Sequence, residues 1–247
     1  MNGILYATAS STIGYDDFKT IITNLSAQIS VSTINAGKVH IVAGLGAEGD
    51  GIDSNGYLVI NGGTVFSAAH PASDAGLDSD LGSFVHGGTV IALGSAMDWA
   101  ESDSRQVTMN LQFAGQQKAG SKVTVTKEDG TEIFSFEDDG SHSRSFSGLI
   151  LSHPAFTQGE TYHVYVDGVQ MAYTGTDVGF GPGGFGGRPG QMSEGFDPEN
   201  MPEDFDPSKI PEGGFGGKGQ FSAQPGEANT SFFMQDKVNF FSGLANV

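Results

Sequence analysis

Five aspartates lie in two short, glycine-rich stretches of the chain and could bind a divalent cation. They are Asp50 and Asp53 in the first stretch and Asp74, Asp78 and Asp80 in the second. Carboxylates and carbonyls on tight turns are hard oxygen ligands, and Ca²⁺ takes about six to eight of them. The chain has no cysteine, which excludes thiolate sites and disulfides. We therefore expect calcium as the cofactor at these aspartates.

The aspartates belong to a sequence repeat. Residues 51–66 align with residues 76–91 without a gap, and seven of the sixteen positions are identical. A fixed period of roughly 20–50 residues is typical of solenoid folds. Each copy alternates apolar and polar residues and contains a Gly-Gly corner, which indicates strands. The repeat therefore predicts a parallel β-helix.

This stacking would place Asp53 over Asp78 and Asn55 over Asp80. Neighbouring strands lie about 4.8 Å apart. Carboxylates at that spacing repel, so one must keep a proton unless a cation lies between them. The alternative is a solvated acidic corner, in which Asp, Asn and Gly only serve turn chemistry.

A third, weaker repeat unit at residues 34–39 extends the stack to about three rungs. Alternation along each strand predicts two inward ladders, Ile34/Ile60/Val85 and Val39/Val65/Val90. It also predicts two outward apolar stacks, Val59 over Phe84 and Phe66 over Ile91. Two such stacks are a large apolar surface for a small solenoid, so we expect another part of the protein to cover at least one of them.

The predicted fold class is all-β: a short parallel β-helix with a C-terminal β cap and a Gly/Pro-rich tail. Alternation and two Asp-Gly turns predict cap strands at 107–113, 122–127, 132–136, 148–152, 162–166 and 169–173. The five predicted segments are a cap or strand at 1–28, rungs at 29–106, the β cap at 107–174, a low-complexity segment at 175–222, and a closing strand or helix at 223–247.

Two segments have open interpretations. Apolar spacing within residues 15–25 fits a short capping helix, although a strand fits about equally well. Residues 175–222 are rich in Gly, Pro and acidic residues, for which disorder is the usual expectation. The phenylalanines that recur there suggest instead a tail that packs on the outward stacks or on a neighbouring molecule.

Charge and hydropathy limit the partners. The net charge of −18 argues against binding to nucleic acid or an anionic membrane surface. No apolar run is long enough for membrane insertion. The N-terminus lacks the pattern of a signal peptide, so export would need a signal outside this chain.

Several stretches resemble a secreted clostridial-type family of carbohydrate-binding proteins. They are residues 49–56, 59–65, 77–80, 102–106 and 152–162, within a resemblance that covers roughly residues 33–175. The resemblance implies a right-handed parallel β-helix similar to pectate lyases, with calcium at the rung turns. By matching positions, Asp50, Asp53, Asp78 and Asp80 would bind the metal. It also implies an extracellular or cell-surface location and binding to plant cell-wall polysaccharides such as cellulose or polygalacturonate.

We expect a non-catalytic, polysaccharide-binding protein, with Trp99, Tyr57 and Phe84 as candidate stacking residues for sugars. One alternative is a structural subunit that forms homo-oligomers or filaments through its Phe-rich tail. A weaker alternative is a polysaccharide lyase, which needs a base such as Lys38 or Arg105 beside calcium. Neither basic residue lies in a recognisable motif. The rung histidines, His40, His70 and His86, fit surface positions better than zinc ligands.

Overall fold

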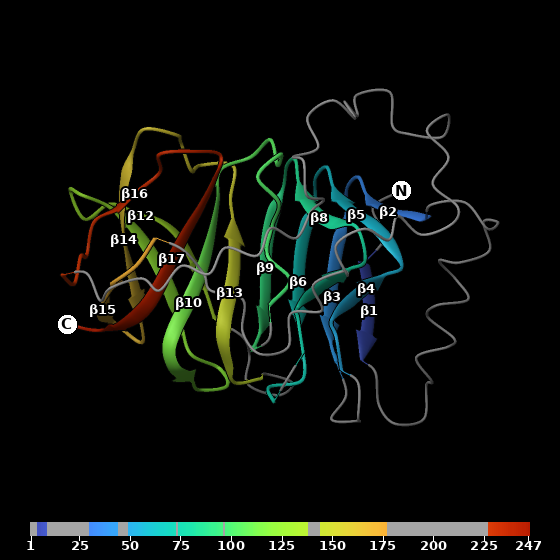
Figure 1. Ribbon diagram of the computed structural model, residues 1–247, viewed down its shortest axis with the longest axis horizontal. Coiled ribbons are helices and arrows are strands. Elements are labelled where there is room, and N and C mark those ends of the chain that lie inside the picture. Colours follow the sequence, from blue (N-terminus) through green and yellow to red (C-terminus); the bar gives the residue numbers. More distant parts are fainter. Residues whose placement is uncertain are drawn as a thin grey trace, which may run out of the picture.

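The computed structural model describes residues 4–8, 30–43, 49–72, 74–95, 97–137, 144–176 and 227–247. All regular secondary structure in these residues is β, and none of them is helical. The strands form one large curled sheet and two small ones (Figure 1). The predicted all-β class is therefore confirmed. The possible helix at 15–25 and most of the low-complexity segment lie outside the described residues.

Three parallel ladders build the N-terminal half. The first contains β1 (Ile4–Thr8), β3 (Lys38–Val42), β6 (Thr64–Ala68) and β9 (Thr89–Gly94). The second contains β2 (Ser30–Ile34), β5 (Gly56–Ile60) and β8 (Gly82–Val85). The third is a short pair, β4 (Ile52–Ser54) and β7 (Leu77–Ser79).

The register of these ladders is the register of the sequence repeat. Ile34 pairs with Ile60 and Ile60 with Val85; Val39 pairs with Val65 and Val65 with Val90. Ile60, Val85, Val65 and Val90 belong to one buried apolar cluster, here called the rung core, which also contains Ile52, Leu58 and Leu77. Ile34 and Val39 are partly buried and pack against it. Both predicted inward ladders are therefore confirmed.

Glycine pairs allow the tight corners between the second and first ladders. Gly63 and Gly88 both have φ of +91°, a conformation that side chains disfavour. A Cβ at Gly88 would lie 2.6 Å from the carbonyl oxygen of Gly63 in the rung below. The corner is also linked between rungs, because Asn61 Nδ2 donates to Asn35 Oδ1 at 2.8 Å. The repeated Gly-Gly pair is thus required by backbone conformation and by close stacking.

The C-terminal half continues the large sheet with mixed strand directions. β13 (Phe146–Ser152) pairs antiparallel with β9 and β10 (Thr108–Gln117), and β10 pairs parallel with β17 (Val238–Asn246). Beyond β17 the order is β15 (Val169–Ala172), β14 (Thr161–Val166), β11 (Val123–Lys127) and β12 (Glu132–Phe136), with β16 (Phe232–Phe233) beside β14. Each predicted cap strand has a counterpart here, and the predicted closing element is the strand β17.

The C-terminal strands curl over one of the two outward stacks predicted for the rungs. Phe66 and Ile91 lie in a second cluster, here called the cap core, with side chains of β10, β11, β13 and β14. The rings of Phe66 and Phe136 have centroids 5.9 Å apart. The expectation that another part of the chain covers this stack is confirmed, and the cap packs along the side of the rungs.

Residues 97–106 connect the rungs to the cap beside the last rung. Ala100 forms a parallel bridge with Ser83, and the amides of Arg105 and Gln106 both donate to the carbonyl of Val85. Trp99 and Ala100 belong to the rung core. This segment thus continues the edge of the second ladder and contributes to the core at that end.

Candidate functional site

The pairing of β4 with β7 positions two of the predicted metal ligands. Asp53 and Asp78 are Cα partners in this parallel ladder. Their neighbours Ile52 and Leu77 are also partners and point into the rung core. Because side chains alternate along a strand, both carboxylates lie on the outer face of the ladder. The predicted stacking of Asp53 and Asp78 is therefore confirmed.

Burial and like charge disfavour ionisation at this corner. The pKa of Asp78 is raised to about 7, first by burial and then by the charges of Asp50, Asp98, Asp53 and Asp80, in that order of effect. The pKa of Asp53 is also raised, first by burial and then by Asp80. The charge conflict inferred from the sequence is therefore present in the fold.

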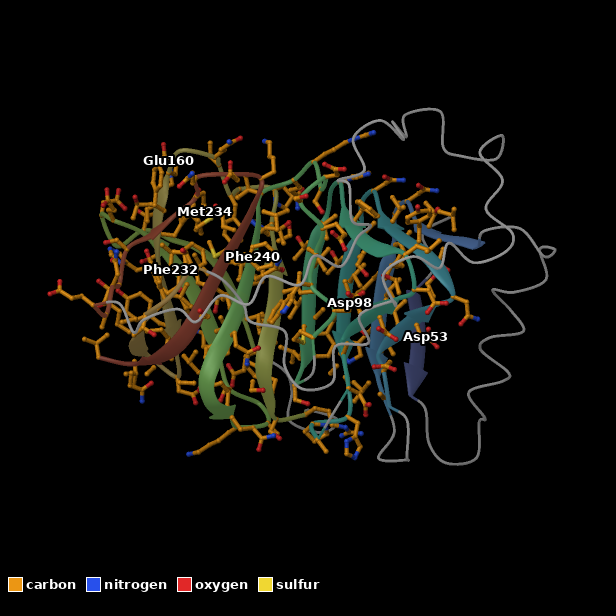
Figure 2. All side chains as sticks on the ribbon, viewed as in Figure 1. Asp53, Asp98, Glu160, Phe232, Met234 and Phe240 are labelled. Carbon is orange, nitrogen blue, oxygen red and sulfur yellow. The ribbon has the colours of Figure 1, made fainter. Side chains whose placement is uncertain are left out.

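Asp98 is a member of this acidic group that sequence analysis missed. Its Oδ2 accepts hydrogen bonds from the hydroxyls of Ser79 at 2.9 Å and Ser83 at 3.4 Å. The pKa of Asp98 is raised to about 6, because burial raises it by more than these hydrogen bonds lower it. Figure 2 labels Asp98 and Asp53 in the rung half of the molecule. Asp98 lies outside the repeat, and only its position after the last rung could have indicated the contact.

Glu101 extends the acidic group along the second ladder. Its pKa is raised to about 7, first by burial and then by the charges of Asp98 and Asp103. A Cβ at Gly82 would lie 3.0 Å from Glu101 Cγ and 3.1 Å from Phe84 Cε2, so both side chains approach this glycine. Glu101 therefore lies between the acidic corner and the aromatic residues of the second ladder.

The other predicted ligands occupy different positions. Asp50 Oδ1 accepts a hydrogen bond from the amide of Ala75 at 2.8 Å, which fixes the turn of the next rung. Asp74 Oδ2 lies 3.7 Å from His70 Nδ1. Asp80 is exposed at the end of β7. Of the five predicted ligands, Asp53 and Asp78 thus form a pair. Asp50 and Asp80 act on the pKa values of that pair, and Asp74 lies beside His70.

The carboxylate oxygens at this corner are suitable ligands for a hard cation such as Ca²⁺. The described side chains alone, however, do not form a complete coordination shell. Within the described ranges, no three Asp, Glu, His or Cys side chains are close enough to hold one metal ion. A cation at Asp53 and Asp78 would therefore need backbone carbonyls or water as further ligands, which is ordinary for Ca²⁺. The pair of partly buried carboxylates supplies the negative charge for such a site.

The three aromatic residues proposed to stack on sugars are buried. The exposed fractions are 9% for Trp99, 6% for Tyr57 and 8% for Phe84. Trp99 belongs to the rung core, and the Tyr57 and Phe84 rings contact each other with centroids 5.9 Å apart. The exposure on which their assignment depended is thus absent. The alternation of the sequence could not predict this burial. It depends on the packing of residues 97–106 and on the contact between the Tyr57 and Phe84 rings.

Comparisons with protein-family models, with curated proteins and with solved structures each found no match. The resemblance to a secreted carbohydrate-binding family therefore stays a prediction. In the part of the chain that the structure describes, no helix is long and apolar enough to cross a membrane.

Proposed function

We propose that this protein is a non-catalytic, calcium-binding, extracellular protein that binds polysaccharide. The observation that supports the calcium part is the register pairing of Asp53 with Asp78, together with a pKa of about 7 for Asp78. We also propose that the three parallel ladders are turns of a right-handed parallel β-helix, as the resemblance implies.

Calcium would act on the stability of the rungs. Bound Ca²⁺ supplies positive charge between carboxylates that otherwise repel. The residues that would hold it are Asp53 and Asp78, and Asp50, Asp80 and Asp98 contribute to the surrounding field. Calcium is abundant outside cells, where extracellular modules typically have dissociation constants of about 10⁻⁴–10⁻³ M. An extracellular location is therefore part of the proposal.

The non-catalytic part rests on the surroundings of the carboxylates. A lyase needs a basic residue beside the acidic site, and neither Lys38 nor Arg105 contributes to the pKa shifts of Asp53 or Asp78. Both basic side chains are exposed, Lys38 at the start of β3 and Arg105 after the last rung. Their positions favour ordinary surface charges.

Two measurements test the proposal. Sedimentation with insoluble cellulose or with polygalacturonate gels should remove the wild-type protein from solution. Incubation with soluble polygalacturonate should give no increase in absorbance near the ~235 nm band of the unsaturated product that lyase chemistry would form. If the protein stays in solution with both polymers, the polysaccharide part is wrong. If the absorbance increases, the non-catalytic part is wrong.

Self-assembly is a second candidate, and the strand β2, which is the edge of the second ladder among the described strands, supports it. Its sequence, Ser-Val-Ser-Thr-Ile, contains no charged residue and no proline. Such residues usually protect an exposed edge strand from pairing with another chain. Val31 is 37% exposed. Filaments in electron micrographs that disappear in a Val31→Lys variant would support assembly through this edge. Replacement of residues 177–226 by a Gly/Ser linker, which keeps β17, would test the tail. A monomer at all concentrations in sedimentation velocity would contradict both routes.

A further inference from the structure

The outer face of the cap sheet carries polar and aromatic side chains. On β11, Val123 and Val125 belong to the cap core, and on β14, Val164 and Val166 do so. Because side chains alternate, the intervening residues point to the opposite face. These residues are Thr124 and Thr126 on β11 and Thr161, His163 and Tyr165 on β14.

The strand register arranges these side chains in rows. Tyr165 pairs with Thr124 on one side and with Gln170 on the other, and Thr124 pairs with Ser135. Thr126 pairs with His163 in the next row. Thr124 Oγ1 and Ser135 Oγ lie 3.4 Å apart, whereas His163 Nδ1 donates to the carbonyl oxygen of Thr230 at 2.7 Å and lies 3.2 Å from Gln170 Nε2. We call the set of Thr124, Thr126, Ser135, His163, Tyr165, Gln170 and Phe233 the outer platform.

Two aromatic residues lie at opposite ends of the outer platform. Phe233 on β16 is the Cα partner of Thr161, and its neighbour Phe232 points into the cap core. Phe233 is 48% exposed, and no other Phe, Tyr or Trp of the described residues is classed as exposed. Thr161 and Tyr165 are four residues apart on one strand, or about 13 Å. The platform is therefore longer than one sugar ring, with a polar centre and an aromatic residue at each end.

A buried hydroxyl on the platform has no hydrogen-bond partner among the described residues. Thr126 is 8% exposed, and its Oγ1 makes no hydrogen bond there. Buried polar groups are normally paired, because an unpaired hydroxyl loses the hydrogen bonds that water gave it. Because the oxygen atom itself is almost completely covered, it does not form part of the surface that a ligand would contact.

We propose that the outer platform is the site that binds polysaccharide, and that the polysaccharide is neutral. This inference rests on the proposed polysaccharide-binding function and moves its site from the rungs to the cap. A sugar ring has an apolar C–H face, which packs on aromatic rings, and hydroxyls, which pair with Thr, Ser, Gln and His.

The charge of the protein favours cellulose over polygalacturonate as the bound polysaccharide. The platform contains no Lys or Arg, and Glu132, the partner of Thr126 on β12, lies at its margin. The chain as a whole carries a net charge of −18. At the margin Glu132 offsets the exposed Lys122 beside β11, so the net negative charge would repel a uronate polymer. Cellulose, which is uncharged, would meet no such repulsion.

Binding measurements on the full chain with calcium present test this assignment. Isothermal titration with soluble cello-oligosaccharides should show binding that Tyr165→Ala and Phe233→Ala each weaken roughly three- to tenfold. Val31→Ala, an exposed apolar residue on the distant β2, is the matched control and should bind as the wild type does. Thermal melts should show all three variants folded, since Phe233 and Val31 are exposed and Tyr165 lies on the outer face.

The outcomes separate this inference from the function on which it rests. If the wild type binds neither cello-oligosaccharides nor oligogalacturonates, the polysaccharide-binding function itself is wrong. If the wild type binds and both platform variants bind equally well, the function stands and the platform assignment is wrong. Tighter binding to oligogalacturonates would overturn the assignment to a neutral polymer.

Discussion

Asp53 on β4 and Asp78 on β7 are Cα partners in a parallel ladder, so two carboxylates face outward on neighbouring rungs. Both have a raised pKa, with burial as the first cause. The same stacking that gives Ile52 and Leu77 a continuous core forces the acids into register. The apolar core therefore stabilises the stacking of the parallel strands, whereas repulsion between the two carboxylates destabilises it. A bound cation would reduce that repulsion.

The charge conflict predicts how stability depends on pH without metal. Asp78 has an ordinary pKa of 3.8 and a folded-state pKa of about 7. The folded state therefore binds more protons between these values, and stability falls as pH rises through that window. Thermal melts in EDTA should show a lower melting temperature at pH 8 than at pH 5. Asp78→Asn should reduce that difference, and an unchanged pH dependence in this variant would contradict the assignment.

Calcium should raise the melting temperature of the wild type. A ligand at about 100 times its dissociation constant stabilises by about 2.7 kcal/mol. That corresponds to roughly 5–10 °C for a chain of this size. Differential scanning calorimetry in calcium and in EDTA measures the shift, which the double variant Asp53→Ala/Asp78→Ala should lack. Asp129→Ala, which removes an acid from the β11–β12 turn, is the control and should retain it.

The rung corners should not tolerate a side chain. Gly88→Ala places a Cβ 2.6 Å from Gly63 O and forces alanine into φ of +91°. Backbone strain of this kind costs about 1–3 kcal/mol, and the close contact adds to it. Gly115→Ala is the matched control, because no atom lies within 4 Å of its Cβ position. Urea unfolding should show a clear loss for the first variant and little change for the second. Equal stabilities would contradict the tight stacking of the corners.

Phe66 should couple the rungs to the cap. It is 7% exposed and packs with Phe136 in the cap core. Phe66→Ala should therefore cost about 3–5 kcal/mol, and Val31→Ala on the exposed edge should cost much less. Chemical denaturation followed by circular dichroism measures both losses. A loss below about 1 kcal/mol for Phe66→Ala would show that the cap contributes little to the packing of this residue.

The local pattern predicts more of the fold than of the site. The spacing of 25 residues between Asp53 and Asp78 gives the ladder register directly, since identical positions stack. Alternation likewise places Val65 inward and Phe66 outward. That Phe66 is covered by Phe136, seventy residues later in the chain, depends on the curl of the whole sheet, which no local pattern encodes.

The site depends on segments without periodicity. Asp98 and Glu101 join the acidic group because residues 97–106 pack along the last rung, and that packing has no sequence repeat. The same segment brings Trp99 into the rung core, where it is only 9% exposed. The outer platform, in contrast, could have been found from alternation on β14, where Tyr165 follows the buried Val164.

Direct measurement of calcium binding tests the central claim. Isothermal titration of calcium into metal-free protein at pH 7.5, where Asp78 is mostly ionised, should give saturable binding for the wild type and for Asp129→Ala. The Asp53→Ala/Asp78→Ala double variant, shown to be folded by circular dichroism, should give none. Absence of binding to the wild type, or equal binding to the double variant, would contradict the claim that calcium binds at this pair of aspartates.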